Sequence, residues 1–95
     1  MEKYLVVIEK ADNNYSAFAP DMPGCITVGA TIEETIFFIK EAIELYLECM
    51  AEEGEIIPFS KGLRYYIEQG VFDEHRVAEE YYIAQVEVSF PKLAA

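Results

Sequence analysis

The sequence predicts an α+β fold, a small antiparallel sheet with one long helix packed on it. Three short β-rich segments near the N-terminus are separated by turn residues and precede a long stretch with helical periodicity. A last segment, 81–90, again alternates between apolar and polar residues. The expected order is β-β-β-α-β, with a short helical insertion at 59–80 before the last strand. The 95 residues, 53% of them hydrophobic, suffice for a single domain over 1–95.

The first strand is expected over 3–9, KYLVVIE, because both of its alternating sets of side chains are apolar. A strand of that kind belongs inside a sheet that is covered on both faces. The Asp and Asn residues at 12–14 tolerate turn conformations, so 15–19, YSAFA, should return as the second strand of a hairpin. A third strand is expected over 25–29, CITVG.

The second and third strands are joined by the sequence PDMPG, which predicts a tight corner. Pro20 and Pro23 lack the backbone N–H that strand pairing needs, and Gly24 permits a positive φ. Asp21 is expected to make Asx-type hydrogen bonds within the corner. The predicted role of these residues is therefore structural.

The long helix is expected to begin after Thr31, which can form a capping box with Glu34. Gly54 marks its end, with Pro58 beyond it as a stop. Seven apolar residues recur at helical spacing on one stripe, which must lie against the sheet. They are Ile32, Ile36, Ile39, Ile43, Tyr46, Leu47 and Met50.

Acidic residues outnumber basic ones by 18 to 7, which gives a formal net charge of −11. Eight acids and one lysine lie between Thr31 and Glu55, so this segment alone carries 1 − 8 = −7. Such a charge opposes binding to a phosphate backbone, and no direct contact with nucleic acid is expected. A basic protein is a better match for this surface.

Two further rows of side chains lie away from the core stripe when residues are placed at roughly 100° per position. The acidic row is Glu34, Glu41, Glu48 and Glu52. The apolar row is Phe38, Leu45 and Cys49. The apolar row needs a cover, either the segment after Pro58, a second copy of the chain or a partner protein. A solvated face that contributes only solubility is the simpler alternative. The apolar row favours a docking face for a basic protein.

The segment after Pro58 predicts a short helix from Ser60 to Gly70 and a further helical turn or two from near Asp73. The last strand is predicted because apolar residues alternate with polar ones, which is typical of a half-buried strand. Its apolar set is Tyr82, Ala84, Val86, Val88 and Phe90.

An enzymatic interpretation has little support in the sequence. Asp12, Asp21 and Glu41 are the carboxylates that a magnesium-dependent nuclease would recruit, but the negative charge would repel its substrate. His75 has no identifiable nucleophile or orienting partner. No catalytic residue, metal site or cofactor is therefore expected.

The remaining sequence signals concern the cellular compartment of the protein. Cys25 and Cys49 lack the spacing of a metal or redox motif, which favours reduced structural thiols. The N-terminal apolar run, five residues from Tyr4 to Ile8, is too short for a signal peptide or a membrane span. We expect a cytoplasmic protein without a membrane contact.

The stretch YSAFAPDMPGCITVGATIEETIFFIKEAIELYLECMAEEGEIIP resembles the HicB family of antitoxins. The family pattern runs from a Tyr-Ser-Ala strand through a Pro-Asp-Leu-Pro-Gly-Cys corner into a Thr-capped helix. The matching positions are Pro20, Asp21, Pro23, Gly24, Cys25, Gly29 and Thr31, with Met22 in place of the usual leucine. The resemblance implies a partial ribonuclease-H-like fold without catalytic acids. It also implies binding and neutralisation of a small basic ribonuclease of the HicA type.

Two departures from the family pattern affect this expectation. Many members continue into a DNA-binding helix-turn-helix or ribbon-helix-helix, whereas here no separate DNA-binding domain is expected. The 59–80 insertion is also longer than usual, and we expect it to cover Phe38 and Leu45, in the same chain or across a homo-oligomer, either a dimer or a tetramer. The alternative to an antitoxin is a stand-alone oligomeric interaction or regulatory module without a toxin partner.

Overall fold

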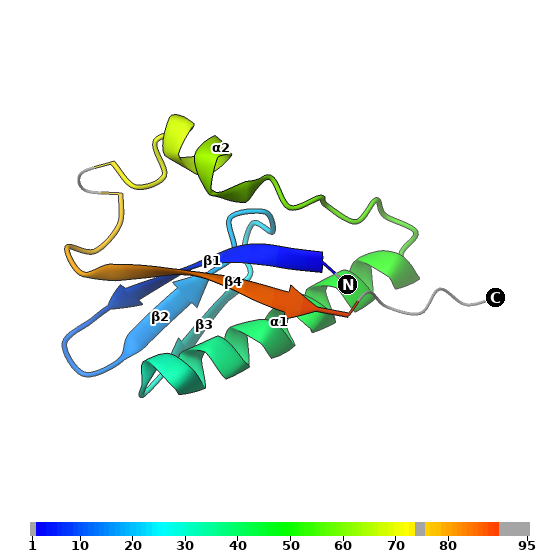
Figure 1. The fold of residues 1–95 in the computed structure, drawn as a ribbon. Coiled ribbons are helices and arrows are strands. Elements are labelled where there is room, and N and C mark those ends of the chain that lie inside the picture. Colours follow the sequence, from blue (N-terminus) through cyan, green and yellow to red (C-terminus); the bar gives the residue numbers. More distant parts are fainter. Residues whose placement is uncertain (1, 74–75, 90–95) are drawn as a thin grey trace.

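The computed structural model describes residues 2–73 and 76–89, and it has the predicted α+β architecture (Figure 1). His75 and Phe90, which entered the sequence predictions, lie outside the described residues. The elements in chain order are β1 (Glu2–Lys10), β2 (Tyr15–Phe18), β3 (Ile26–Gly29), α1 (Ile32–Glu52), α2 (Gly62–Glu68) and β4 (Tyr81–Val88). No helix within this part of the chain is long and apolar enough to cross a membrane.

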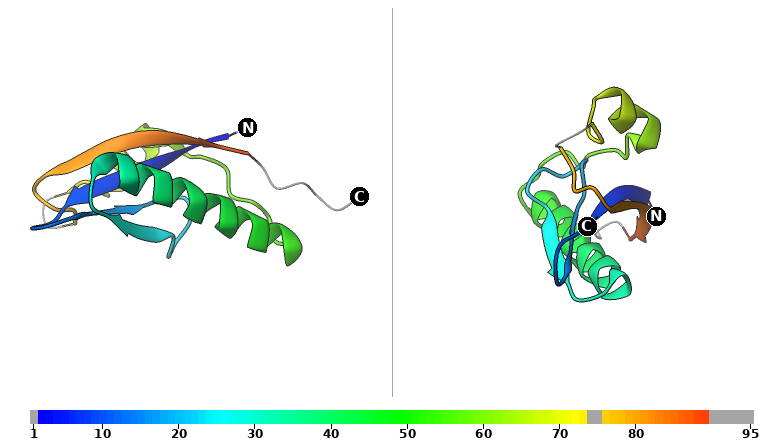
Figure 2. Two further views of the ribbon diagram at one scale, coloured as in Figure 1. Left: turned by 90° about the horizontal axis from the view of Figure 1, so that it is seen from below. Right: turned by 90° about the vertical axis from the view of Figure 1, so that its left-hand side faces the viewer.

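The four strands form one antiparallel sheet in the order β3-β2-β1-β4. β1 lies inside the sheet, where Val7 is opposite Phe18 of β2 and Ile83 of β4. The helix α1 covers one face, and α2 lies on the other face, where it contacts β1 (Figure 2). Every side chain from Tyr4 to Ile8 is buried, as both apolar faces of this strand predicted.

Backbone hydrogen bonds close the corner at 20–24. The Met22 N–H donates to the Ala19 carbonyl over 2.9 Å, and the Cys25 N–H donates to the Met22 carbonyl over 3.0 Å. Gly24 has a φ of 86°, the left-handed conformation that glycine adopts without steric cost. The prediction of a positive φ at this position is confirmed.

The helix α1 starts with the predicted cap. The Thr31 hydroxyl accepts from the Glu34 N–H over 3.0 Å, and the Glu34 carboxylate lies 3.5 Å from the N–H of Ala30, one residue before the cap. Three residues of the predicted stripe, Ile39, Ile43 and Leu47, are fully buried against the sheet. Ile32, Ile36 and Tyr46 are partly buried and pack against the same core. Met50 is also partly buried.

The approach of α1 to the sheet depends on two small residues. Gly29 of β3 is buried beneath the first turn of α1, and a Cβ atom there would lie 2.8 Å from the backbone nitrogen of Thr35. Thr35 is itself completely buried, and its hydroxyl donates to the Thr31 carbonyl over 2.6 Å. The chain can therefore bury a hydroxyl at this contact without leaving it unpaired.

The insertion at 59–80 differs in part from its prediction. The expected helix from Ser60 to Gly70 is present over Gly62–Glu68, with Lys61 rather than Ser60 at its N-terminal cap. The second helical segment from Asp73 is not found in the described part of 71–80, which consists of turns and bends. Gly70, with a φ of 78°, ends α2 and turns the chain away from the helical path.

Candidate partner-binding surface

The outer face of α1 is acidic. Its predicted acidic row is exposed along the whole helix: Glu34, Glu41, Glu48 and Glu52. None of these carboxylates forms an ion pair with another described residue, since the pair found is Arg64 with Glu68 on α2. Their charges are therefore not neutralised within this part of the chain.

An apolar row runs beside these glutamates. The side chain of Leu45 is 61% exposed, that of Phe38 is 38% exposed, and Cys49 is also exposed. Phe37 adds a second aromatic ring, 60% exposed and packed edge-to-face on Phe38 at 6.0 Å between centroids. The sequence prediction did not include Phe37. An aromatic residue that lies outside the core stripe of a helix is itself a signal of an exposed contact surface.

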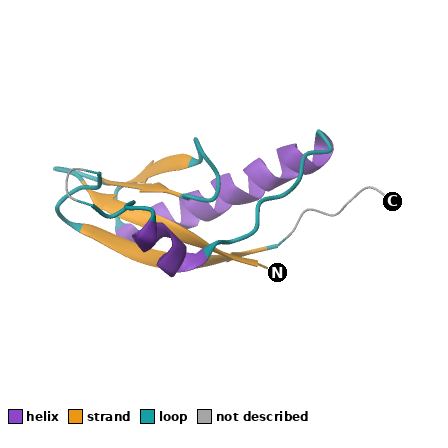
Figure 3. Ribbon diagram, turned by 90° about the horizontal axis from the view of Figure 1, so that it is seen from above, coloured by secondary structure: helices purple, strands orange, loops and turns teal. Residues whose placement is uncertain are grey.

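The prediction that the 59–80 insertion covers this apolar row within the same chain is wrong. α2 lies over the sheet face opposite α1 (Figure 3), so Phe38 and Leu45 remain exposed. The insertion is placed there because β1 is apolar on both faces, and its second face, with Leu5 and Val7, also has to be covered.

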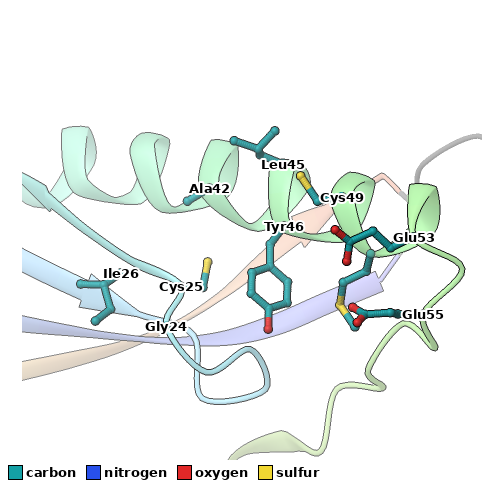
Figure 4. Close-up of a pocket in the computed structure, with 10 residues that line it drawn as sticks. Gly24, Cys25, Ile26, Ala42, Leu45, Tyr46, Cys49, Glu53 and Glu55 are labelled. Atoms are coloured by element: carbon teal, nitrogen blue, oxygen red, sulfur yellow. The ribbon is translucent and has the colours of Figure 1, made fainter.

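A groove of about 430 Å³ lies next to the C-terminal half of the apolar row. One wall comes from α1 and the other from the start of β3 and the corner before it, where Gly24, Cys25 and Ile26 lie (Figure 4). At the C-terminal end of α1 the glutamates Glu53 and Glu55 border it. The α1 wall consists of Ala42, Leu45, Tyr46, Cys49 and Met50. The groove therefore combines an apolar lining with an acidic end.

The two cysteines of the chain both line this groove but differ in accessibility. Both are free thiols, with Cys25 buried and Cys49 exposed. Burial raises the pKa of the Cys25 thiol, which reduces its fraction of reactive thiolate. Cys49 is therefore the thiol of the groove that an added reagent should reach first.

Asp21 connects the corner to the insertion. Its Oδ1 atom accepts from the Tyr66 hydroxyl over 2.5 Å and from the Lys61 N–H over 3.2 Å. The expected Asx-type bonds within the corner are replaced by these contacts, because the side chain points toward α2 and is only 7% exposed. Burial and the bond to Asp21 together raise the pKa of Tyr66 well above its usual range. The Oδ2 atom is buried without a hydrogen-bond partner among the described residues.

The carboxylates considered for a metal-dependent nuclease do not come together. Asp12 is exposed in the β1–β2 turn, Asp21 is buried against α2, and Glu41 is exposed on α1. Within 2–73 and 76–89, no three His, Cys, Asp or Glu side chains gather closely enough to hold a metal ion.

Comparisons with known proteins give the same family as the resemblance found in the sequence. The family model described as "HicB_like antitoxin of bacterial toxin-antitoxin system" matches residues 4–93. An uncharacterized 14.9 kDa protein of Haemophilus phage HP1 is 39% identical over 66 residues, which are 70% of this chain and 50% of the phage protein. The chain thus aligns with about half the length of that relative.

Two solved structures share the fold. The Burkholderia pseudomallei antitoxin HicB has a TM-score of 0.77 and 26% identity, covering 99% of this chain and 67% of that one. A chain of a HicA3 and HicB3 toxin-antitoxin complex has a TM-score of 0.69 and 24% identity, covering 92% of this chain and 98% of that one. With a family match over nearly its whole length and this fold, the chain belongs to the HicB-like antitoxins of bacterial toxin-antitoxin systems.

Proposed function

We propose that this chain binds and neutralises a small basic toxin ribonuclease of the HicA type through the outer face of α1. The proposed docking surface is the apolar row Phe38, Leu45 and Cys49 with the acidic row Glu34, Glu41, Glu48 and Glu52. The observation that carries the proposal is the juxtaposition, on one helix, of exposed apolar side chains with glutamates that have no ion-pair partner among the described residues. Family membership supports the antitoxin role, and the HicA3 and HicB3 complex supports a HicA-like partner.

Electrostatics would give the docking surface its selectivity. A ribonuclease must hold a polyanion, so the surface around its active site is basic. The segment from Thr31 to Glu55, with its charge of −7, offers that surface an alternative acidic ligand. Complementary charge speeds association and orients the partner, while contributing less to the lifetime of the complex.

The apolar row would slow the dissociation of the complex. Leu45 and Cys49 border the groove, and an apolar side chain of the toxin inserted there would be removed from water. Buried anchors of this kind, surrounded by a polar rim, carry most of the energy at protein interfaces. We therefore expect Leu45 to be the most sensitive single position of the docking surface.

The decisive experiment compares Leu45→Asn with Ile67→Asn. Both side chains are similarly exposed, 61% and 56%, but Ile67 lies on α2, on the opposite face of the sheet. Each variant is titrated into an RNA-cleavage assay of a HicA-type toxin that the original chain inhibits. We expect Leu45→Asn to inhibit roughly tenfold less well or worse, which corresponds to about 1.4 kcal/mol. Ile67→Asn should inhibit like the original chain.

Cys49 provides a second readout without a change in sequence. A bulky maleimide attached to Cys49 should abolish inhibition, and bound toxin should protect Cys49 from the reagent. Inhibition by Cys49→Ser should not change on treatment with maleimide, and this comparison of treated with untreated Cys49→Ser controls for effects at Cys25. If Leu45→Asn and maleimide-treated chain both inhibit as well as the untreated chain, the toxin binds elsewhere and the proposed docking surface is wrong.

A further inference from the structure

The residues that lead into α2 and form it differ in charge from the rest of the sequence. Between Glu55 and Glu68 lie twelve residues, 56–67, without an acidic side chain, the longest such run in the sequence. Two of them, Lys61 and Arg64, are basic, so the rest of the chain carries −11 − 2 = −13. This stretch is therefore a local positive region on a strongly acidic protein.

Apolar side chains are exposed on the same segment. Phe59 is 78% exposed, Ile67 is 56% exposed, and Leu63 and Tyr65 are exposed as well. Leu63 and Ile67 are one helical turn apart, so they lie side by side on α2. The two basic side chains are exposed among these apolar ones. We call the six residues together the α2 surface: Phe59, Lys61, Leu63, Arg64, Tyr65 and Ile67.

Buried contacts hold the inner side of the insertion against the rest of the domain. The buried Tyr66 of α2 donates to Asp21, which also accepts from the Lys61 N–H. In the segment before α2, the Tyr4 hydroxyl donates to the Pro58 carbonyl over 2.8 Å. A helix of seven residues is not stable by itself in water, so these contacts fix the position of the α2 surface. Its exposed apolar side chains add little to the core, which favours a contact with another molecule.

The charge of the α2 surface selects an acidic protein segment as its partner. A basic segment would meet two like charges and no acid within 56–67. A nucleic acid needs several cations along its phosphates, and an anionic membrane surface typically attracts clusters of about four to eight. The α2 surface has two, on a chain that is otherwise strongly acidic. A short acidic segment with apolar side chains needs only these two charges for a complementary contact.

The acidic face of α1 does not prevent this contact. α1 and α2 cover opposite faces of the sheet (Figure 2). The glutamates on the outer side of α1 are separated from α2 by the sheet and by the helix diameter of about 10 Å. Exposed charges farther apart than a Debye length, about 8 Å at physiological salt, are largely screened from each other.

We propose that the α2 surface binds an acidic, apolar segment of a protein other than the toxin. Carboxylates of that segment pair with Lys61 and Arg64, and its apolar side chains pack against the apolar residues of the α2 surface. Arg64 Nε now lies 3.1 Å from the Glu68 carboxylate, an exposed ion pair that contributes little stability, so a carboxylate of the partner can replace it. The Lys61 ammonium lies 5.2 Å from the centre of the Tyr65 ring, a cation–π contact that keeps it on this surface. Because α1 stays uncovered, the chain can hold this partner and the toxin together.

The first test screens a displayed library of random peptides, each about 12 residues long to match the 56–67 stretch, against the original chain. We expect one class of enriched peptides to combine Asp or Glu with apolar residues. A synthetic peptide of this class is then titrated by fluorescence anisotropy. Arg64→Glu and Ile67→Asn should each bind it roughly tenfold more weakly or worse, and both side chains are exposed, so the fold should be retained. A library that yields no acidic peptide, or an acidic peptide that binds both variants with the original affinity, would overturn the proposal.

The second test uses a substitution that should strengthen binding. Glu68→Gln removes the carboxylate that competes for Arg64, so it should bind the acidic peptide about twofold more tightly. Glu44→Gln removes the same charge from α1, across the sheet, and should leave the affinity unchanged. Equal gains from both substitutions would indicate a general charge effect and contradict a specific site at α2.

Two comparisons separate this proposal from its alternatives. Tighter binding of oligouridine or of phosphatidylserine vesicles than of the acidic peptide would contradict the choice of a protein segment. Leu45→Asn should retain the acidic peptide, whereas Ile67→Asn should lose the peptide and retain inhibition of the toxin. Failure of this proposal and failure of the docking proposal are therefore distinguishable.

Discussion

Replacement of Gly29 by alanine tests how closely α1 approaches the sheet. The added Cβ would lie 2.4 Å from the Thr35 hydroxyl oxygen, 2.8 Å from the Thr35 nitrogen and 2.9 Å from the Thr35 Cα. Contacts under 3.0 Å to backbone atoms cannot be relieved by a side-chain rotation, so the first turn of α1 must shift. Overpacking of this kind costs typically about 1–3 kcal/mol. A domain of this size should then lose roughly 4–8 °C in Tm for each kcal/mol.

The assay is thermal unfolding followed by circular dichroism, with Ala30→Ser as the control. Ala30 is the exposed neighbour of Gly29, and one added heavy atom there should change stability by no more than about 0.5 kcal/mol. Adding Thr35→Ala to Gly29→Ala removes the contact with the hydroxyl but not those with the backbone, so it should restore little of the loss. An unchanged or higher Tm for Gly29→Ala would refute the close contact, because alanine also restricts the unfolded chain and would stabilise an unstrained site.

Two further predictions concern the buried polar contacts. Asp21→Ala leaves the Tyr66 hydroxyl and the Lys61 N–H without an acceptor, so it should lower the free energy of unfolding in urea by about 1.5–3 kcal/mol. Asp21→Asn retains an acceptor and should lower it less. Equal losses for the two variants would contradict the hydrogen-bond explanation. Burial is the largest cause that raises the pKa of Tyr4 to about 12, and the negative charges of Glu2 and Asp21 add to it. Because the folded state retains this proton longer than the unfolded state, stability should fall as pH rises from about 10 toward 12. Tyr4→Phe should have a shallower alkaline decline in Tm, and an identical slope would contradict the assignment.

The fold was predictable because its signals are local. Thr31 and Gly54 delimit α1, and the alternation in 3–9 requires a strand covered on both faces. The course of the insertion was not predictable. Asp21 meets Tyr66, 45 residues further along the chain, and nothing near either residue in the sequence indicates that contact. Asp21 therefore looked like an ordinary turn residue.

The candidate surface was predictable on one side only. Helical spacing alone places Phe38, Leu45 and Cys49 in one row, and all three are exposed in the structure. The opposite wall of the groove comes from the corner before β3, whose position beside α1 depends on tertiary packing. The position of β3 at the edge of the described sheet likewise follows from the strand order, which periodicity does not determine.

The acidity of α1 works against the stability of the helix itself. Glu44, Glu48 and Glu52 follow each other at i, i+4 spacing, where like charges destabilise a helix by about 0.2–0.5 kcal/mol per pair. The last turn contains no basic residue, so Glu52 lies at the negative end of the helix dipole. Because these acidic residues destabilise the helix, their presence requires another explanation, and we propose that they bind a basic partner.

This conflict predicts opposite effects of a single substitution. Glu48→Gln removes two like-charge contacts, so the free chain should gain several tenths of a kcal/mol in stability. The same change should slow association with the toxin, and the difference from the original chain should shrink as salt is raised. Glu87→Gln on β4, distant from α1 in sequence and outside the docking surface, serves as the control for association. A Glu48→Gln chain that is more stable and still associates at the original rate would show that the acidic row serves solubility rather than recognition.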